Sequence, residues 1–275
     1  MMIDLHSHIL PNICDGPKSM DVSLEMARMA VDDGITVQAC TPHIYPNVYK
    51  NNAINIQQGI DAFKEELASH AIPLKLVIGA DTHMVPNVLE GLNTGRIPCL
   101  NNSRYFLLEP SHHVAVPRFV ERTVQIIEAG YTPLITHPER LAWIDTHYSE
   151  FEEVARKGAW IQITAGAIDG KFGKKARHWA EKFLEDGLVH IIATDSHNNQ
   201  HRPPVLSRGV ALAESIVGAE EANKMVNERA LAVIKNIPVA DVSKPLRLLD
   251  SAQVNTAQLH QKKKTGFIQN LFQRL

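Results

Sequence analysis

The sequence has 275 residues, 44% of them hydrophobic and 21% charged, and a formal net charge of −2 at pH 7. This balance is ordinary for a globular protein, and the near-neutral charge excludes a general attraction to nucleic acid. No apolar run is long enough to span a membrane, and the N-terminus lacks the pattern of a secretory signal. Three cysteines without a Cys-x-x-Cys spacing indicate reduced thiols, so we expect a cytoplasmic protein.

Short strand-like runs alternate with amphipathic helical stretches along most of the chain. The runs cover residues 2–8, 36–41, 74–79, 105–109, 132–137, 160–164 and 189–195. Apolar residues at helical spacing predict helices over residues 20–33, 54–67, 118–129 and 174–186. Alternation of this kind predicts a parallel sheet, and the number of units favours one closed or nearly closed α/β barrel. Such barrels place their chemistry at the carboxyl ends of the strands.

The first strand-like run contains the segment His6-Ser7-His8. A strand sends every second side chain to the same face, so both imidazoles point the same way. Two neighbouring neutral imidazoles are unfavourable in an apolar core, but they are well suited to bind a metal ion together. The pair alone is a weak signal, because short His-x-His matches arise by chance.

Imidazoles and carboxylates recur at the ends of all later runs except the sixth, residues 160–164. Taken singly, each would more often be a backbone-bonded histidine, a turn aspartate or a helix cap. Their repetition at one end of a barrel predicts a metal centre instead. The predicted ligands are His6, His8, Asp15, His43, Asp81, Glu109, His137, Asp195 and His197.

Five imidazoles and four carboxylates, with no thiolate, suit Mn, Fe, Zn, Co or Mg rather than a structural zinc site. Nine ligands exceed the needs of one ion and suit two or three ions bridged by carboxylates. Three divalent ions and four carboxylates leave a net charge of about +2, which attracts a phosphate dianion and lowers the pKa of bound water. Metal-assisted hydrolysis of a phosphoester is therefore the predicted chemistry.

Two arginines follow predicted metal ligands closely. Arg140 lies three residues after His137, and Arg202 lies five residues after His197. A guanidinium holds two phosphate oxygens at once and stays charged, so both are predicted phosphate-binding, catalytic residues. The alternative for Arg140 is a surface salt bridge, for example with Glu139.

The ordered set of motifs resembles the polymerase and histidinol phosphatase (PHP) superfamily. It is most similar to the bacterial protein-tyrosine phosphatases of capsular and exopolysaccharide systems, over roughly residues 2–240. The motifs are His6-Ser7-His8, Asp15-Gly16-Pro17-Lys18-Ser19, His43, Glu109, His137-Pro138-Glu139-Arg140, Asp195-Ser196-His197-Asn198 and Arg202-Pro203-Pro204. The resemblance implies a distorted TIM-like (β/α)7 barrel with a trinuclear centre, usually Mn²⁺. It also implies phosphotyrosine as substrate, on the tail of a membrane-bound tyrosine autokinase.

The resemblance also implies an assignment of ligands to ions. One ion would be held by His6, His8, Glu109 and Asp195. A second ion would be held by Asp81, Glu109 and His137. A third ion would be held by Asp15, His43 and His197. The family commonly has Glu at the position of Asp81, which leaves His83 as an alternative ligand. Cys14 stands where relatives often carry a second acidic residue. No Cys-x5-Arg loop is present, so no phosphocysteine intermediate is expected.

Two other functions remain open from the sequence. One is a phosphoesterase for histidinol phosphate or another small molecule on the same scaffold. The other is a metal-binding regulatory module without catalysis. The intact ligand set and the motif details favour the tyrosine phosphatase.

The predicted barrel domain covers residues 1–240, and residues 241–275 form a basic tail. The tail has six Lys or Arg against two Asp. Its last apolar residues, Phe267, Ile268, Leu271, Phe272 and Leu275, have helical spacing. A frayed end or a helix packed on the barrel is the favoured interpretation. The alternative is a peripheral membrane anchor for acidic lipid or a nearby partner. The oligomeric state is not predictable.

Overall fold

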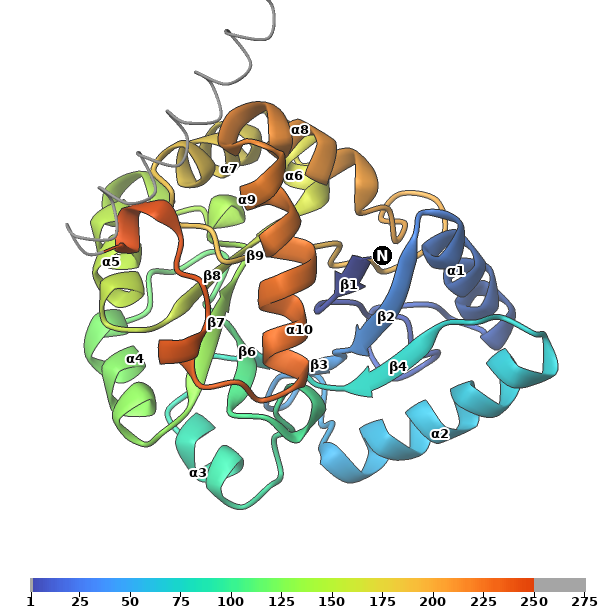
Figure 1. The fold of residues 1–275 in the computed structure, drawn as a ribbon. Helices are drawn as coiled ribbons and strands as arrows, with labels where there is room; N and C mark the ends of the chain where they lie inside the picture. Colours follow the sequence, from blue (N-terminus) through green and yellow to red (C-terminus); the bar gives the residue numbers. More distant parts are fainter. Residues whose placement is uncertain (1, 250–275) are drawn as a thin grey trace, which may run out of the picture.

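The computed structural model describes residues 2–249 as an α/β structure with strands at the centre and helices around them (Figure 1). The strands are β1 (Met2–Asp4), β2 (Ile35–Cys40), β3 (His43–Ile44), β4 (Lys75–Ile78), β5 (Asp81–His83), β6 (Tyr105–Glu109), β7 (Thr132–Thr136), β8 (Trp160–Thr164) and β9 (Ile191–Ala193). The α-helices are α1 (Met20–Asp32), α2 (Ala53–Ser69), α3 (Val88–Asn93), α4 (Phe119–Glu128), α5 (Ile144–Arg156), α6 (Ala165–Ile168), α7 (Gly173–Glu185), α8 (Ser207–Val217), α9 (Ala219–Asn223) and α10 (Arg229–Ile234). The four predicted helices and the seven predicted strand-like runs are therefore confirmed.

All strand pairings are parallel and fall into two sheets, β1-β2-β4 and β3-β5-β6-β7-β8-β9. The second and third predicted runs correspond to β2 and β4. Strands β3 and β5 follow them after two intervening residues, so the chain links the two sheets at both points. The last run meets the first through backbone hydrogen bonds from Asp195 N–H to His6 O (2.9 Å) and from His8 N–H to Ser196 O (2.8 Å). The predicted α/β barrel is thus present, with its ring of hydrogen bonds complete at the carboxyl end.

The strands are buried on both faces, which explains why they are near-continuous apolar runs. On the outer face, α1, α2, α4, α5, α7 and α8 cover the strands (Figure 1). On the inner face, Tyr105, Leu107 and Trp160 pack with Ala230 and Val233 of α10. Helices α9 and α10, joined by a π-helical segment (Lys224–Glu228), cross the strands and block the amino end of the barrel.

The first and last runs are regular over shorter stretches than predicted, namely Met2–Asp4 and Ile191–Ala193. The residues beyond them leave the regular ladder because they carry candidate ligands. Asp195 has a φ of 49°, and His137 after β7 has a φ of 37°. Non-glycine residues rarely adopt this left-handed backbone, and it is concentrated at functional sites.

Residues 241–249 of the predicted tail lie on the barrel. Val242 is buried beside α10, and Arg247 N–H donates to Gly187 O at 3.1 Å. The remainder of the tail, with its apolar face, lies outside the described residues. Within residues 2–249, no helix has both the length and the apolar character needed to cross a membrane.

Candidate metal centre

All nine predicted ligands meet at the carboxyl end of the barrel. They form overlapping clusters in which the ligand atoms lie within 4.8 Å of one another. His6 and His8 follow β1, Asp15 precedes α1, His43 is in β3, Asp81 is in β5, Glu109 ends β6, His137 follows β7, and Asp195 and His197 follow β9. Side chains from six of the seven runs thus surround one space, because parallel strands end at the same edge.

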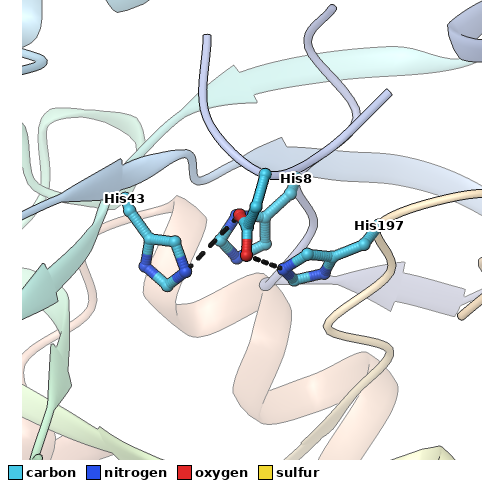
Figure 2. Close-up of side chains that lie close together, drawn as sticks. His8, His43 and His197 are labelled. Atoms are coloured by element: carbon cyan, nitrogen blue, oxygen red, sulfur yellow. Dashed lines mark ion pairs between the residues drawn. The ribbon is translucent and has the colours of Figure 1, made fainter. Parts of the chain in front are cut away.

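One cluster joins Asp15 to His8, His43 and His197. Asp15 lies 3.6 Å from His43 Nε2 and 3.4 Å from His197 Nε2, and Figure 2 shows the three imidazoles turned toward one another. Asp15 reaches them because the next residue is Gly16. A Cβ at Gly16 would lie 2.1 Å from His8 O, so only glycine lets this loop press against the end of the first run.

A second group of ligands lies deeper, around His6. His6 Nε2 lies 3.3 Å from Asp195 Oδ1 and 3.5 Å from Asp81 Oδ2. Its other nitrogen, Nδ1, donates to Gln162 Oε1 at 2.9 Å. This hydrogen bond directs Nε2 toward the carboxylates, and once Nε2 has lost its proton the ring is in the tautomer that a metal ligand needs. Gln162 comes from the sixth run, for which the sequence predicted no ligand, and it acts by orienting one.

Glu109 joins three imidazoles at the rim of the site. Its Oε2 lies 3.5 Å from His43 Nδ1, and its Oε1 lies 3.8 Å from His137 Nε2 and 3.2 Å from His112 Nε2. His112 was not among the predicted ligands. The only signal was a His112-His113 pair shortly after the end of the fourth run, and it could not show which imidazole turns inward.

The geometry distinguishes Asp81 from its alternative, His83. Asp81 is fully buried and belongs to two of the clusters, whereas His83 belongs to none of those found among the described residues. His83 Nδ1 lies 3.5 Å from Glu109 Oε2, and its ring stacks on Tyr45 at 3.9 Å. Asp81 is therefore the better-placed ligand. Cys14 Sγ lies 3.4 Å from His8 Nδ1, and burial raises the pKa of this thiol to about 12.

Two buried atoms that face other candidate ligands have no hydrogen-bond partner. They are Asp81 Oδ2 and His43 Nδ1. Asp81 Oδ2 lies only 3.3 Å from His43 Nδ1, yet the two atoms are not aligned for a hydrogen bond. Two ligands bonded at about 2.0–2.2 Å to one four-coordinate ion lie roughly 3.4 Å apart. The spacing and the orphaned atoms therefore fit divalent cations bound between these side chains.

The charges within the site suit cation binding. Burial opposes ionisation of Asp195, but the positive charge of Arg202 and other nearby groups holds the pKa of Asp195 well below its usual range. Burial also disfavours protonation of His6, but the Asp195 and Asp81 carboxylates raise its pKa to about 9. Burial and a nearby guanidinium lower the pKa of His137 to about 4. The metal-free site is thus carboxylate-rich, and a bound cation would displace the proton from His6.

Both predicted arginines reach the site. Arg140 and Arg202 donate to Asp195 Oδ2, so Arg140 does not pair with Glu139, which accepts from Thr164 N–H at 2.9 Å. Their guanidinium carbons lie 4.4 and 5.6 Å from the ring centroid of Phe172, which the sequence did not single out. A cavity of about 190 Å³ is lined by both arginines, His112 and six of the nine predicted ligands.

The fold and this site define a metal-binding α/β barrel of the PHP type. Residues 2–235 match the family described as capsular polysaccharide synthesis, CpsB/CapC, and the chain belongs to this family. Among its relatives, the tyrosine-protein phosphatase YwqE of Bacillus subtilis is 34% identical over 237 residues, covering 86% of this chain and 92% of the relative.

Solved structures similar to this one include metal-dependent tyrosine phosphatases. One match, from a study of YwqE of Bacillus subtilis and CpsB of Streptococcus pneumoniae described as metal-dependent tyrosine phosphatases, has a TM-score of 0.83. It is 31% identical and covers 89% of this chain and 98% of the other. Histidinol phosphate phosphatase from Lactococcus lactis has a TM-score of 0.53 and 13% identity, over 80% of this chain and 93% of the other, so it shares the fold alone.

Proposed function

We propose that this protein is a metal-dependent tyrosine-protein phosphatase that acts in capsular polysaccharide synthesis. The observation that carries this proposal is the placement of two guanidinium groups beside nine clustered candidate metal ligands, six of which line the same cavity as the two arginines. This arrangement suits a phosphate dianion. The relatives named above identify tyrosine phosphate as the group from which the phosphate is removed.

We propose that the nine predicted residues hold two or three divalent ions. When bound, such ions supply an activated water and stabilise the charge of the transferring phosphoryl group. Gln162 and the Asp195 carbonyl, which accept from His6 Nδ1 at 2.9 Å and from His197 Nδ1 at 3.0 Å, orient two of the imidazoles. The donor set of nitrogen and oxygen atoms supports Mn²⁺ as the native ion, with Fe, Zn, Co or Mg as alternatives.

Arg140 and Arg202 are proposed to bind the phosphate oxygens. Both guanidinium groups already share the outer oxygen of Asp195, and both lie over one face of Phe172. The shared carboxylate and the ring fix their directions, so they are preorganised for an anion in the cavity. Hydrogen bonds from two such groups strengthen as charge develops on the phosphoryl oxygens.

The natural substrate is proposed to be the phosphorylated tyrosine-rich tail of a bacterial tyrosine autokinase. The family's role in capsule synthesis and the resemblance to its phosphatases support this partner. A cytoplasmic location is also proposed, and three free cysteines support it. Peripheral membrane contact through the basic tail would bring the enzyme close to a membrane-bound kinase.

The test is phosphate release from a phosphotyrosine peptide, a phosphoserine peptide and histidinol phosphate. Each assay uses the metal-stripped protein and then the same protein with Mn²⁺ added. We expect Mn²⁺-dependent hydrolysis that favours the phosphotyrosine peptide. Activity on histidinol phosphate alone would replace the proposal by the small-molecule phosphoesterase, and no activity with any ion would refute catalysis.

A further inference from the structure

The imidazole of His112 lies in the metal centre although it belongs to no predicted ligand set. It follows Glu109 by three residues, in the loop between β6 and α4. Its Nε2 lies 3.2 Å from Glu109 Oε1, and its ring stacks on that of His137 with centroids 4.9 Å apart and planes inclined by 28°. The neighbouring His113 is exposed to solvent and is absent from the clusters found in the described part of the chain.

Two hydrogen bonds from the segment after Arg140 hold the backbone of the loop at His112. The indole of Trp143, which is buried, donates to Ser111 O at 2.8 Å. Ala142 N–H donates to the carbonyl of His112 itself, also at 2.8 Å. Two backbone acceptors are therefore fixed to the segment that follows Arg140. These bonds fix the backbone of the loop, from which His112 turns inward while His113 is exposed to solvent.

The spacing of the three side chains matches that of ligands around one ion. Glu109 Oε1 lies 3.2 Å from His112 Nε2 and 3.8 Å from His137 Nε2. Neighbouring ligands of a four-coordinate ion with bonds of about 2.0–2.2 Å are roughly 3.4 Å apart. Asp81 Oδ2 lies 3.9 Å from His137 Nε2 and 3.3 Å from His43 Nδ1, so it also faces His137, but it falls in the clusters of His6 and His43 and not in that of His112.

We propose that Glu109, His112 and His137 form an ion site at the outer edge of the centre, with His112 as a tenth ligand. Two imidazoles and one carboxylate suit Mn²⁺, Co²⁺, Fe²⁺ or Zn²⁺ better than Mg²⁺. The site opens to the cavity that both arginines line, and the side chain of His112 is 28% exposed against 2% for His137. An ion held here would therefore be open to that cavity. The inference deepens the metal-dependent function proposed above.

The experiment counts ions in the full chain rather than relying on activity. Wild type, His112→Ala, His112→Gln and the matched control His113→Ala are stripped of metal, titrated with Co²⁺ or Mn²⁺, and desalted. Ion content is measured by mass spectrometry, and the visible absorption of the Co²⁺ form reports the ligand set. Far-ultraviolet circular dichroism and thermal melting of the metal-free proteins show whether each variant is folded.

We expect both His112 variants to lose one ion equivalent, or to bind it at least 100-fold more weakly, and to change the Co²⁺ spectrum. His113→Ala should match wild type. Glutamine keeps a hydrogen-bond donor for Glu109 but offers no imidazole, so wild-type stoichiometry in His112→Gln would overturn the proposal and leave a hydrogen-bonding role. Unchanged stoichiometry in His112→Ala would also overturn it. Because ions are counted without substrate, a wild-type protein inactive on phosphotyrosine would refute the proposed function and not this site.

Discussion

The two ends of the barrel contrast in what lies between the strands. At the carboxyl end, buried nitrogen and oxygen atoms such as Asp81 Oδ2 and His43 Nδ1 have no hydrogen-bond partner. At the amino end, Ala230 and Val233 of α10 pack against the aromatic rings of Tyr105 and Trp160. The buried guanidinium there is largely paired, because Arg229 donates to Glu221 at 2.7 Å and to Ser243 O at 2.8 Å, and only its Nη1 has no partner.

The carboxyl end of the barrel is suited to binding ions, and the amino end contributes mainly to stability. Unpaired polar atoms weaken a folded protein, so their concentration at one end indicates that they are reserved for bound ions. Apolar packing at the other end supplies the compensating stability through burial of large side chains. Substitutions at the two ends should therefore affect different measurements, activity at the carboxyl end and the free energy of unfolding at the amino end.

The largest effect on activity is expected for His137→Ala. The loss of a ligand shared between clusters should lower kcat/KM on a phosphotyrosine peptide by on the order of 10³-fold or more, with little change in unfolding free energy. Steady-state kinetics with saturating Mn²⁺ would measure it. The control is His178→Ala on the exposed surface of α7. A His137→Ala enzyme within tenfold of wild type would remove this residue from the centre.

The converse experiment at the amino end is Trp160→Ala. Trp160 is 2% exposed, and its ring lies 5.0 Å from those of Tyr105 and His190. Its truncation should lower the free energy of unfolding by about 3–5 kcal/mol, as large-to-small changes of buried aromatic residues do. Urea denaturation would measure the loss, and kcat/KM per folded molecule should stay unchanged. An equal loss of specific activity would contradict the separation of the two ends.

At the carboxyl end, Arg140→Ala tests the anion-binding role. We expect KM to rise and kcat to fall, with kcat/KM lower by about 10²-fold, because the guanidinium contacts both bound phosphate and transition state. Arg140→Lys keeps the charge and loses the two-pronged geometry, so it should lie between wild type and Arg140→Ala. Kinetic constants equal to those of wild type in Arg140→Ala would exclude this role.

The acid stability of the amino end should depend on His190. This residue is buried, its Nδ1 accepts from Ile161 N–H at 3.1 Å, and burial, with Arg229 nearby, lowers its pKa well below 6.5. The unfolded chain therefore binds the proton first as the pH falls below about 6.5, and stability is lost by up to about 1.4 kcal/mol per pH unit.

The matched variant is His190→Asn, which keeps an acceptor for the Ile161 N–H and does not titrate. Urea denaturation of both proteins between pH 7 and pH 5 would give the difference in unfolding free energy. As the pH falls from 7 to 5, we expect the unfolding free energy of wild type to decrease more than that of the variant. A pH-independent difference would show that His190 does not control acid stability.

The smallest expected effect concerns Phe172, which contacts the two arginines. Cation–π interactions at partly exposed sites contribute about 0.5–1 kcal/mol. Phe172→Leu should therefore raise KM by about 2- to 5-fold and change kcat less, since the guanidinium groups remain but are less well positioned. Phe172→Tyr should keep wild-type KM. An unchanged KM in Phe172→Leu would show that the ring does not position the arginines.

The sequence by itself determined which chain segments are strands and what stands at their ends. Near-continuous apolar runs such as residues 105–109 bury both faces, and the alternation with helices predicts that they are parallel. Parallel strands end at one edge, so the polar residue after each run had to meet the others. For this reason the barrel and the nine clustered residues were predictable from local pattern alone.

Other features were decided only by tertiary structure. His6 and Gln162 are 156 residues apart, and nothing in either strand indicates that the amide would orient the imidazole. His112 and His113 are adjacent and alike, yet only His112 turns inward, in a loop that long-range hydrogen bonds join to the segment after Arg140. The ring of Phe172 contacts Arg140 because the fold brings the loop of Phe172 beside the segment of Arg140. These contacts depend on the relative positions of distant segments, which packing of the whole barrel sets and local sequence does not encode.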